Sequence, residues 1–272
     1  MSAAGELAGF DAAAARYDAD EADNPVLLHM RARAFRRFEV AFATGSRLLE
    51  LGSGTGTEAA RLVSERGCSV ALVDPSSQLL AIASAKVRAA ANGGLLGSHD
   101  LPGREIGRLV DVYPPGSFDG AYSSFGALNC EPTLRPVADG LALLLRPGAA
   151  VVLSVINRWC PPEVAWYALH RQWREAARRW GGPVQAAAYA GGPKDVSTTY
   201  YSRREIAEAF AGSFSVTGVE ALPLLWPPPY LDFLVRRFPR AFRAVASLDE
   251  GASRLRVLRD LGDHVLICLR RR

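Results

Sequence analysis

The chain alternates short apolar runs with longer segments in which apolar residues recur at helical spacing. The runs of strand length occupy residues 47–51, 69–73, 118–124 and 149–156. Helical spacing marks the intervening residues 57–66, 75–91 and 132–145. Because a parallel connection needs a long crossover, strands that alternate with helices indicate a parallel sheet. The pattern therefore predicts an α/β fold with a doubly wound, mostly parallel sheet.

Residues 3–43, which precede the first strand, have helical character. Asn24 followed by Pro25 is typical of a helix start, with asparagine as the cap and proline in the first turn. Residues 26–42 continue with apolar residues at helical spacing. We therefore expect N-terminal helices ahead of the sheet.

Two parts of the pattern are harder to interpret. Residues 95–101 and 104–112 compete for the third strand. After the fifth strand, residues 162–180 predict one helix that carries Trp166, Trp173 and Trp180 at intervals of seven. The later segments predict strands at 196–201, 214–223 and 263–270 and a helix at 203–210.

These elements suggest four parts along the chain. They are an N-terminal helical cap (1–45), a cofactor-binding core (46–157), a substrate lid with late strands (158–250) and a final strand that completes the core sheet (251–272). The last two strands are expected at an antiparallel end of the sheet.

Composition narrows the class of protein. Of 272 residues, 49% are hydrophobic, yet no apolar run is long enough to span a bilayer and no signal peptide is visible. The four cysteines form no C-x-x-C pair, which suits a reducing cytoplasm and argues against a zinc site. The net charge of +4 is spread over short arginine clusters, so neither a nucleic-acid partner nor a membrane is expected.

A glycine-rich segment follows the first strand. Gly52, Gly54 and Gly56 stand at alternate positions, and Asp74 ends the next apolar run. Strand, glycine turn, helix, strand and acid form a nucleoside-binding βαβ unit, in which the acid accepts hydrogen bonds from ribose hydroxyls. A dinucleotide site would place its third glycine at position 57, which is threonine. Glu50, close to the turn, suits a ligand with an amino group better than a pyrophosphate.

The pattern E-x-G-x-G-x-G at 50–56 resembles motif I of class I S-adenosylmethionine-dependent methyltransferases. Residues 10–18 resemble an N-terminal motif of small-molecule members, with one extra residue before the tyrosine. The resemblance implies a seven-stranded, Rossmann-like sheet and S-adenosyl-L-methionine as the cofactor, with S-adenosyl-L-homocysteine as product. It covers residues 10–157 and the final strand.

The resemblance also implies cofactor contacts. Tyr17 would reach the methionine carboxylate, Ser124 and Phe125 would follow strand four, and Glu105 with Ile106 would lie near the adenine. Asp100 is a weaker alternative to that pair. The full predicted set is Tyr17, Glu50, Gly52, Ser53, Gly54, Thr55, Gly56, Asp74, Pro75, Glu105, Ile106, Ser124 and Phe125.

The acceptor side is less specific. We predict a pocket lined by Asn157, Arg158, Trp159, Trp166, Tyr200, Trp226 and Tyr230, because aromatic walls suit a planar or apolar molecule. The candidate catalytic residues are His29 and His170, as general bases, and Asn129, as an orienting group. Cys130 and His264 are interpreted as structural, and no metal ligand set is predicted.

The sequence thus predicts a cytoplasmic monomer or homodimer that methylates a small aromatic or apolar molecule by direct in-line transfer. Three alternatives remain open. They are an RNA methyltransferase, an enzyme that binds S-adenosylmethionine but catalyses a reaction such as cyclisation, and a dehydrogenase.

Overall fold

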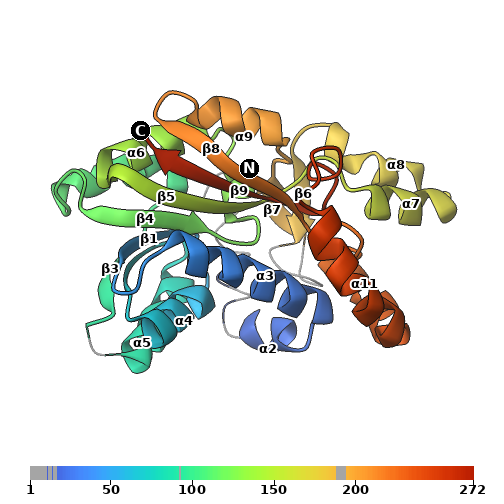
Figure 1. The fold of residues 1–272 in the computed structure, drawn as a ribbon, viewed down its shortest axis with the longest axis horizontal. Coiled ribbons are helices and arrows are strands. Elements are labelled where there is room, and N and C mark those ends of the chain that lie inside the picture. Colours follow the sequence, from blue (N-terminus) through green and yellow to red (C-terminus); the bar gives the residue numbers. More distant parts are fainter. Residues whose placement is uncertain (1–10, 12–13, 15–16, 92, 188–193) are drawn as a thin grey trace.

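One sheet of seven strands forms the centre of the protein. A computed structural model describes residues 11, 14, 17–91, 93–187 and 194–272. The strand order is β3 (Leu95–His99), β2 (Ser69–Val73), β1 (Arg47–Leu51), β4 (Phe118–Ser123), β5 (Leu145–Ile156), β9 (His264–Arg271) and β8 (Phe214–Leu222). The first five strands are parallel, and β9 runs antiparallel to both β5 and β8. The predicted doubly wound, mostly parallel, seven-stranded sheet is confirmed (Figure 1).

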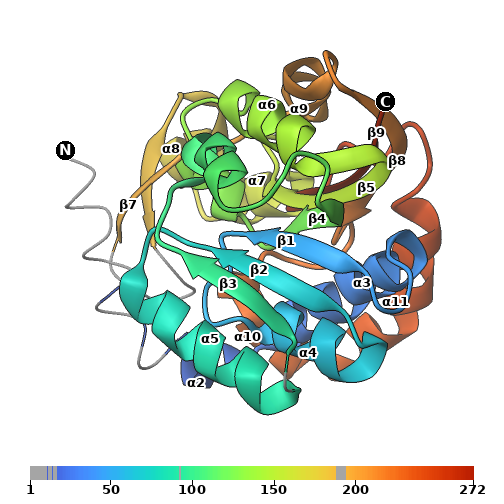
Figure 2. The same ribbon diagram turned by 90° about the vertical axis from the view of Figure 1, so that its left-hand side faces the viewer.

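Helices cover both faces of this sheet (Figure 2). One face packs against α6 (Arg135–Leu144), α9 (Arg203–Phe210) and the 3₁₀ helix η1 (Gly103–Asp111). The other packs against α3 (Pro25–Ala41), α4 (Thr57–Arg66), α5 (Ser77–Ala90), α10 (Asp232–Arg237) and α11 (Pro239–Ala252). Each face therefore has its own apolar core, as a sheet buried on both sides requires.

The N-terminal helix α3 begins where the sequence predicts. The Asn24 side chain accepts hydrogen bonds from the backbone N–H groups of Val26 and Leu27, and Pro25 is the first helical residue. A short helix, α2 (Tyr17–Ala22), precedes it. The cap and the proline therefore act as the sequence indicated.

The third strand is the first of the two competing segments. Residues 95–99 form β3, whereas residues 103–111 form η1. Ile106 and Leu109, three residues apart, are both buried in the core that contains α6. The apolar spacing in this segment is thus helical, and a strand at 104–112 is excluded.

The predicted single helix at 162–180 is wrong. The chain forms α7 (Pro161–Leu169), α8 (Trp173–Ala176) and the 3₁₀ helix η3 (Arg178–Trp180), and Arg171 between α7 and α8 has a positive φ of 58°. Trp173 and Trp180 are exposed, so the heptad spacing does not produce one buried stripe. In Figure 1, α7 and α8 project from the end of the sheet. A lid role for this region stays a prediction.

A second, small sheet follows these helices. It pairs β6 (Val184–Ala187) with β7 (Lys194–Thr198), so the predicted strand at 196–201 does not join the main sheet. Two further 3₁₀ turns, η2 (Ala127–Cys130) and η4 (Pro229–Leu231), complete the elements. Among the described residues, no helix has both the length and the apolar character needed to cross a bilayer.

A buried arginine joins the N-terminal helix to the C-terminal half of the chain. Arg33 on α3, with 2% of its surface exposed, donates hydrogen bonds to Asp249 on α11, to Ser253 Oγ and to the carbonyl of Ala221 on β8. Asp249 is fully buried, and its own oxygen accepts the backbone N–H of Leu224. Removing the guanidinium would leave a buried carboxylate without its main counter-charge.

We predict that Arg33→Met lowers the free energy of unfolding by about 3–5 kcal/mol, because an uncompensated buried charge is expensive. Urea denaturation measures this loss. The control is Arg36→Met, three residues along the same helix, where the pair with Glu250 is exposed. It should change stability by less than about 1 kcal/mol. Equal effects of the two variants would contradict the assigned role of Arg33.

Candidate cofactor and acceptor site

The loops that follow β1, β2 and β4 meet at one edge of the sheet. β1 pairs in parallel with β2 on one side and with β4 on the other, so their carboxyl ends coincide. This is where the strand order reverses, since β3 and β2 extend one way and β4 and β5 the other. Open α/β sheets bind ligands at such a switch point.

The three glycines after β1 have different physical roles, although all have positive φ values, of 66°, 50° and 72°. A Cβ on Gly52 would lie 2.1 Å from the Cβ of Ala127, and one on Gly56 would lie 2.9 Å from the Cα of Ala83. These two glycines permit close packing. A Cβ on Gly54 would meet no described atom within 4 Å. Gly54 is therefore the position where the backbone is open to a ligand.

Asp74, at the end of β2, holds this loop. Its two carboxylate oxygens accept the backbone N–H of Gly54 at 2.8 Å and that of Ser76 at 2.9 Å. Burial raises the pKa of Asp74 to about 6, and the two backbone hydrogen bonds oppose that rise. Each oxygen keeps a second lone pair, which suits the two hydroxyls of a ribose.

Three more polar atoms at this edge are buried without a hydrogen-bond partner among the described residues. They are Glu50 Oε2, Ser53 Oγ and Ser124 Oγ, and the Glu50 carboxyl also interacts with the side chain of Tyr122. Burial, and then the charge of Glu58, raises the pKa of the Glu50 carboxyl well above its ordinary value. Unpaired buried polar groups are costly, so a ligand that supplies an ammonium group and hydroxyls would complete this set.

The N-terminal segment lies over the same loops. Asp18 on α2 accepts hydrogen bonds from Thr55 Oγ1 at 2.5 Å and from Lys86 Nζ at 2.7 Å. Asp11 accepts one from Ser76 Oγ at 2.5 Å. The sequence indicated a cap through Tyr17, but not these aspartate contacts. Residues 1–10 lie outside the described part, and the cofactor contact of Tyr17 stays a prediction.

The two residues predicted to lie near the adenine, Glu105 and Ile106, lie on η1. Ile106 is buried in the core, and Glu105 pairs with Arg108 on the surface. The residue that follows β3 is Asp100, whose charge acts on Asp74. Both alternatives for the adenine contact stay predictions.

The loop after β4 brings an aromatic ring to the edge in a strained conformation. Phe125 has a φ of 51°, which is uncommon for any residue other than glycine. The Arg31 guanidinium lies 5.2 Å from the centre of its ring, and Arg31 also pairs with Glu58 of α4. Such strain is typical of functional sites, where the surroundings enforce it.

Two of the three predicted catalytic residues have other roles. The Asn129 amide donates to the carbonyls of Ile156 and Thr199, and its oxygen accepts the N–H of Ile156. It therefore fixes the end of β5. His170 is exposed at the end of α7, where its Nδ1 lies 2.7 Å from the carbonyl of Trp166. Their catalytic roles stay predictions.

His29 remains a candidate. Its ring stacks on Trp226, with ring centres 4.2 Å apart and an angle of 6° between the planes. Its Nε2 lies 3.7 Å from Asp249 Oδ2. His29 Nε2 and Trp226 Nε1 are both buried without a hydrogen-bond partner among the described residues.

Most of the predicted pocket residues are engaged in structure. Asn157 donates to the carbonyls of Trp159, Asp260 and Gly262. Arg158 pairs with Glu205 and donates to the carbonyl of Tyr200, while Trp159 is exposed against Trp180. Trp166 is half-buried between His170 and Phe233. Trp226 stacks on His29, and its Nε1 has no hydrogen-bond partner among the described residues.

A buried ion network accounts for the two tyrosines of that set. Glu163 accepts hydrogen bonds from Arg178, Arg179 and the Tyr230 hydroxyl. Arg179 also donates to Asp263, and its guanidinium lies 5.0 Å from the ring centre of Tyr200. These contacts anchor α7 and η3 to the start of β9.

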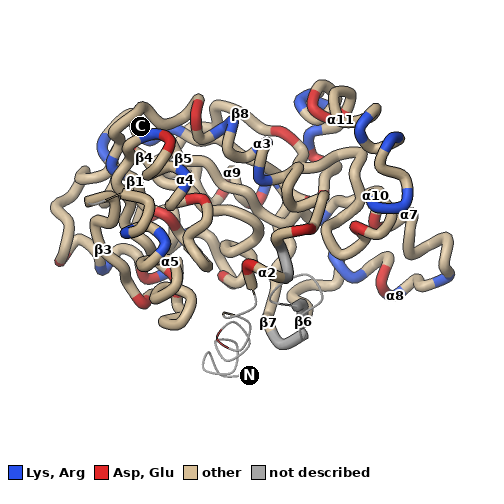
Figure 3. The backbone as a smooth tube through the Cα atoms, turned by 90° about the horizontal axis from the view of Figure 1, so that it is seen from below, with Lys and Arg blue, Asp and Glu red and all other residues tan. Residues whose placement is uncertain are grey.

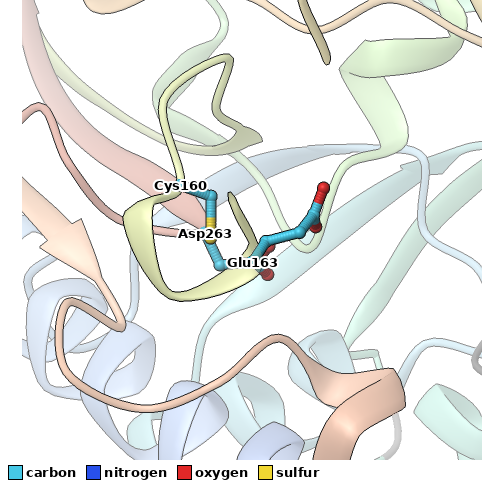
Figure 4. A group of neighbouring side chains, drawn as sticks. All are labelled: Cys160, Glu163 and Asp263. Atoms are coloured by element: carbon cyan, nitrogen blue, oxygen red, sulfur yellow. The ribbon is translucent and has the colours of Figure 1, made fainter. Parts of the chain in front are cut away.

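Part of this network resembles a metal site. Ligand atoms of Cys160, Glu163 and Asp263 lie within 4.8 Å of one another (Figure 4). However, Arg179 donates to both carboxylates and Arg178 donates to Glu163, so two negative charges already face two positive ones. Burial raises the pKa of the Cys160 thiol, which disfavours the thiolate that a metal would need. The cluster is better described as an ion-pair network.

Comparisons with known proteins agree with this site. The sequence profile described as a methyltransferase domain matches residues 26–213. The chain belongs to this methyltransferase family. The predicted class I, Rossmann-like fold is confirmed. S-adenosylmethionine, which the glycine motif indicated, is confirmed as the cofactor.

The individual relatives are distant. The chain is 28% identical to the ubiquinone/menaquinone biosynthesis C-methyltransferase UbiE of Citrifermentans bemidjiense, over 45% of this chain and 52% of that protein. The match therefore spans about half the length of this curated relative.

Solved structures share the fold. An S-adenosylmethionine-dependent methyltransferase from Mesorhizobium loti is 22% identical, with a TM-score of 0.58 over 89% of this chain and 98% of the other. Geranyl diphosphate C-methyltransferase from Streptomyces coelicolor A3(2), solved with S-adenosyl-L-homocysteine, is 16% identical, with a TM-score of 0.56 over 89% and 76%.

We predict that Gly54→Ala weakens binding of S-adenosylhomocysteine at least tenfold, because a Cβ would occupy the open face of the loop. Titration calorimetry measures this. Gly148→Ala is the matched control, since Gly148 also has a positive φ, of 80°, and open space around it. Both variants should lose about 1–2 kcal/mol of stability from the left-handed backbone. Equal affinities for the ligand would show that Gly54 does not face it.

The raised pKa of Asp74 predicts a pH dependence. Below about pH 6 the carboxyl becomes protonated and accepts ribose hydroxyls less well, so the dissociation constant of S-adenosylhomocysteine should rise by up to about tenfold per unit between pH 6 and 5. Because folding raises the pKa of Asp74, protonation of this carboxyl stabilises the folded, ligand-free protein as the pH falls through that pKa. Unfolding caused by this group therefore does not explain the weaker binding.

Calorimetry from pH 5 to 7 tests this, with Asp74→Asn as control. That variant should bind more weakly and with little pH dependence. An unchanged slope in Asp74→Asn would assign the titration to another group.

Proposed function

We propose that this protein transfers a methyl group from S-adenosylmethionine to a small organic molecule with a planar or apolar body. The observation that carries the proposal is the set of unpaired buried polar atoms at the carboxyl edge, beside the open Gly54. Their chemistry fits the cofactor: Asp74 suits the ribose, and Glu50 suits the amino group. Enzymes that use this cofactor receive from it an already activated methyl group.

The residues of this chain then position the ligand and exclude water from it. The backbone at Gly54 and the carboxylate of Asp74 fix one end of the ligand, and Asp18 and Asp11 tie the N-terminal segment over it. In-line displacement needs the acceptor within about 3–3.5 Å of the methyl carbon, so correct placement alone lowers much of the barrier. Water exclusion strengthens each of these contacts.

The proposed acceptor is small. The stacked pair of His29 and Trp226 offers an aromatic wall in which Trp226 Nε1 has no hydrogen-bond partner among the described residues, and this suits a planar molecule that carries a polar group. The names of the relatives point the same way, because ubiquinone, menaquinone and geranyl diphosphate are all small molecules.

An RNA acceptor is less well supported. Lysine and arginine are interspersed with aspartate and glutamate along most elements and do not form one continuous stripe in the view of Figure 3. Many arginines on the described surface are already paired, for example Arg61 with Glu65 and Arg204 with Glu208. RNA binding needs clustered, available positive charge.

The test is methyl transfer from tritiated S-adenosylmethionine to a panel of hydroxylated aromatics, quinones and prenyl diphosphates, with transfer RNA as a further acceptor. We expect label in at least one small molecule. Asp74→Ala should lower kcat/KM about 100-fold through the lost hydrogen bonds of a charged group. Arg204→Gln, at an exposed site, should leave the rate unchanged.

Three results would contradict the proposal. Label that appears in RNA alone would favour an RNA methyltransferase. Conversion of an acceptor with S-adenosylmethionine recovered unchanged would favour a cyclase or a related enzyme. Binding of NADH in place of S-adenosylhomocysteine would revive the dehydrogenase.

A monomer or homodimer stays a prediction, which light scattering would measure.

A further inference from the structure

His264 occupies an unexpected place for a structural histidine. It is the first residue of β9 and pairs with Ile156, the last residue of β5. Because β9 is antiparallel to β5, the start of β9 lies at the carboxyl end of the parallel strands. His264 therefore lies at the same sheet edge as the proposed cofactor site, although the sequence placed it in the interior of a strand.

The direction of its side chain follows from the strand. Val265 and Ile267 are buried in the core that contains α6, and Leu266 is buried in the core that contains α3. Side chains alternate along a strand, so His264 faces the α3 side together with Leu266. Phe125 and Trp226 also pack against that core. The rings of Phe125 and His264 meet edge to face, with centres 6.4 Å apart.

Asp263 sets the chemical state of this histidine. Its Oδ2 lies 3.0 Å from His264 Nδ1, and its Oδ1 accepts a hydrogen bond from Arg179. Arg179 and then His264 hold the pKa of the Asp263 carboxyl below its ordinary value, so it is a carboxylate that accepts. His264 Nδ1 must then carry the proton of that hydrogen bond, and in the neutral ring the free lone pair lies on Nε2.

That lone pair has no partner. His264 is 5% exposed, and its Nε2 makes no hydrogen bond to any described residue. The other charged groups of this corner are already engaged, since Arg179 binds Glu163 as well as Asp263, and Arg31 on the far side of Phe125 binds Glu58. A buried acceptor held in one orientation by a carboxylate is the arrangement of a general base.

We propose that His264 is the general base for the acceptor and that the acceptor is a phenol or an enol whose hydroxyl group faces Nε2. This proposal rests on the proposed function, because it assigns the acceptor half of the same site. It replaces Asn129 and His170 with a residue that the structure, unlike the sequence, places at the edge. Asp263 is the positioning residue of the pair.

In the proposed step, His264 removes the hydroxyl proton of the acceptor during methyl transfer. The acceptor O–H bond breaks, Nε2 binds the proton, and the oxygen keeps the electron pair. That oxygen forms a bond to the methyl carbon while the carbon–sulfur bond breaks and its electron pair stays on sulfur. The products are the methyl ether and S-adenosylhomocysteine, and the proton on His264 then passes to water.

The first experiment is ¹⁵N NMR of protein labelled at histidine and saturated with S-adenosylhomocysteine. His264→Gln assigns the resonance by its absence, and backbone connectivity to Val265 assigns it if that variant does not fold. We expect a protonated Nδ1 and an unprotonated Nε2 at neutral pH. The opposite tautomer would overturn the proposal.

The second part of the experiment adds one of two ligands. Phenol has a hydroxyl proton that Nε2 would accept, and anisole has none. Phenol should shift the Nε2 resonance and anisole should not. The phenol dissociation constant should rise about 3- to 10-fold in His264→Gln, as expected for one hydrogen bond, and stay unchanged in the exposed-site variant Arg204→Gln. No response to phenol, or equal responses to both ligands, would also overturn the proposal.

Calorimetry with S-adenosylhomocysteine tests the proposed function separately from the assignment of His264 as the base. If that ligand binds and phenol fails to act on His264, only the base assignment falls. If S-adenosylhomocysteine does not bind, the proposed function itself fails.

Discussion

The hydrogen bond from the backbone of Gly54 to the carboxylate of Asp74 is the contact on which the site depends. It joins the loop after β1 to the end of β2, and the second oxygen of Asp74 fixes Ser76 at the start of α5. The left-handed glycines make this approach possible, and burial of the carboxyl raises its pKa to about 6. The contact thereby holds a buried carboxylate in one position, where it can accept hydrogen bonds from a ribose.

A second constraint comes from the reversed direction of β9. In a purely parallel sheet, the last strand would begin at the amino edge, far from the ligand. Here β9 starts at the carboxyl edge, where Asp263 binds both Arg179 and His264. The ion network of Glu163 and Arg178 holds Arg179 in place. Thus a region that contributes no residue to the glycine motif still shapes the acceptor side of the site.

The sequence predicted the local features well and the long-range ones poorly, for a physical reason. Glycine spacing, the Asn24 cap and the alternation of strands and helices are set by nearby residues, and each is confirmed. The roles of Asn129 and His264 depend on partners in other elements, namely the end of β5 and the Asp263 carboxylate. The heptad of tryptophans failed because the chain turns between α7 and α8, where Arg171 has a positive φ. No local pattern carries such information.

The central claim is that ligands complete the unpaired polar atoms at the carboxyl edge. A crystal structure with bound S-adenosylhomocysteine tests it most directly. The account predicts both ribose hydroxyls on Asp74, the amino group near Glu50 and the thioether sulfur facing Phe125 and His264. A ligand bound at another edge, or one that leaves Asp74 and Glu50 without contact, would contradict it.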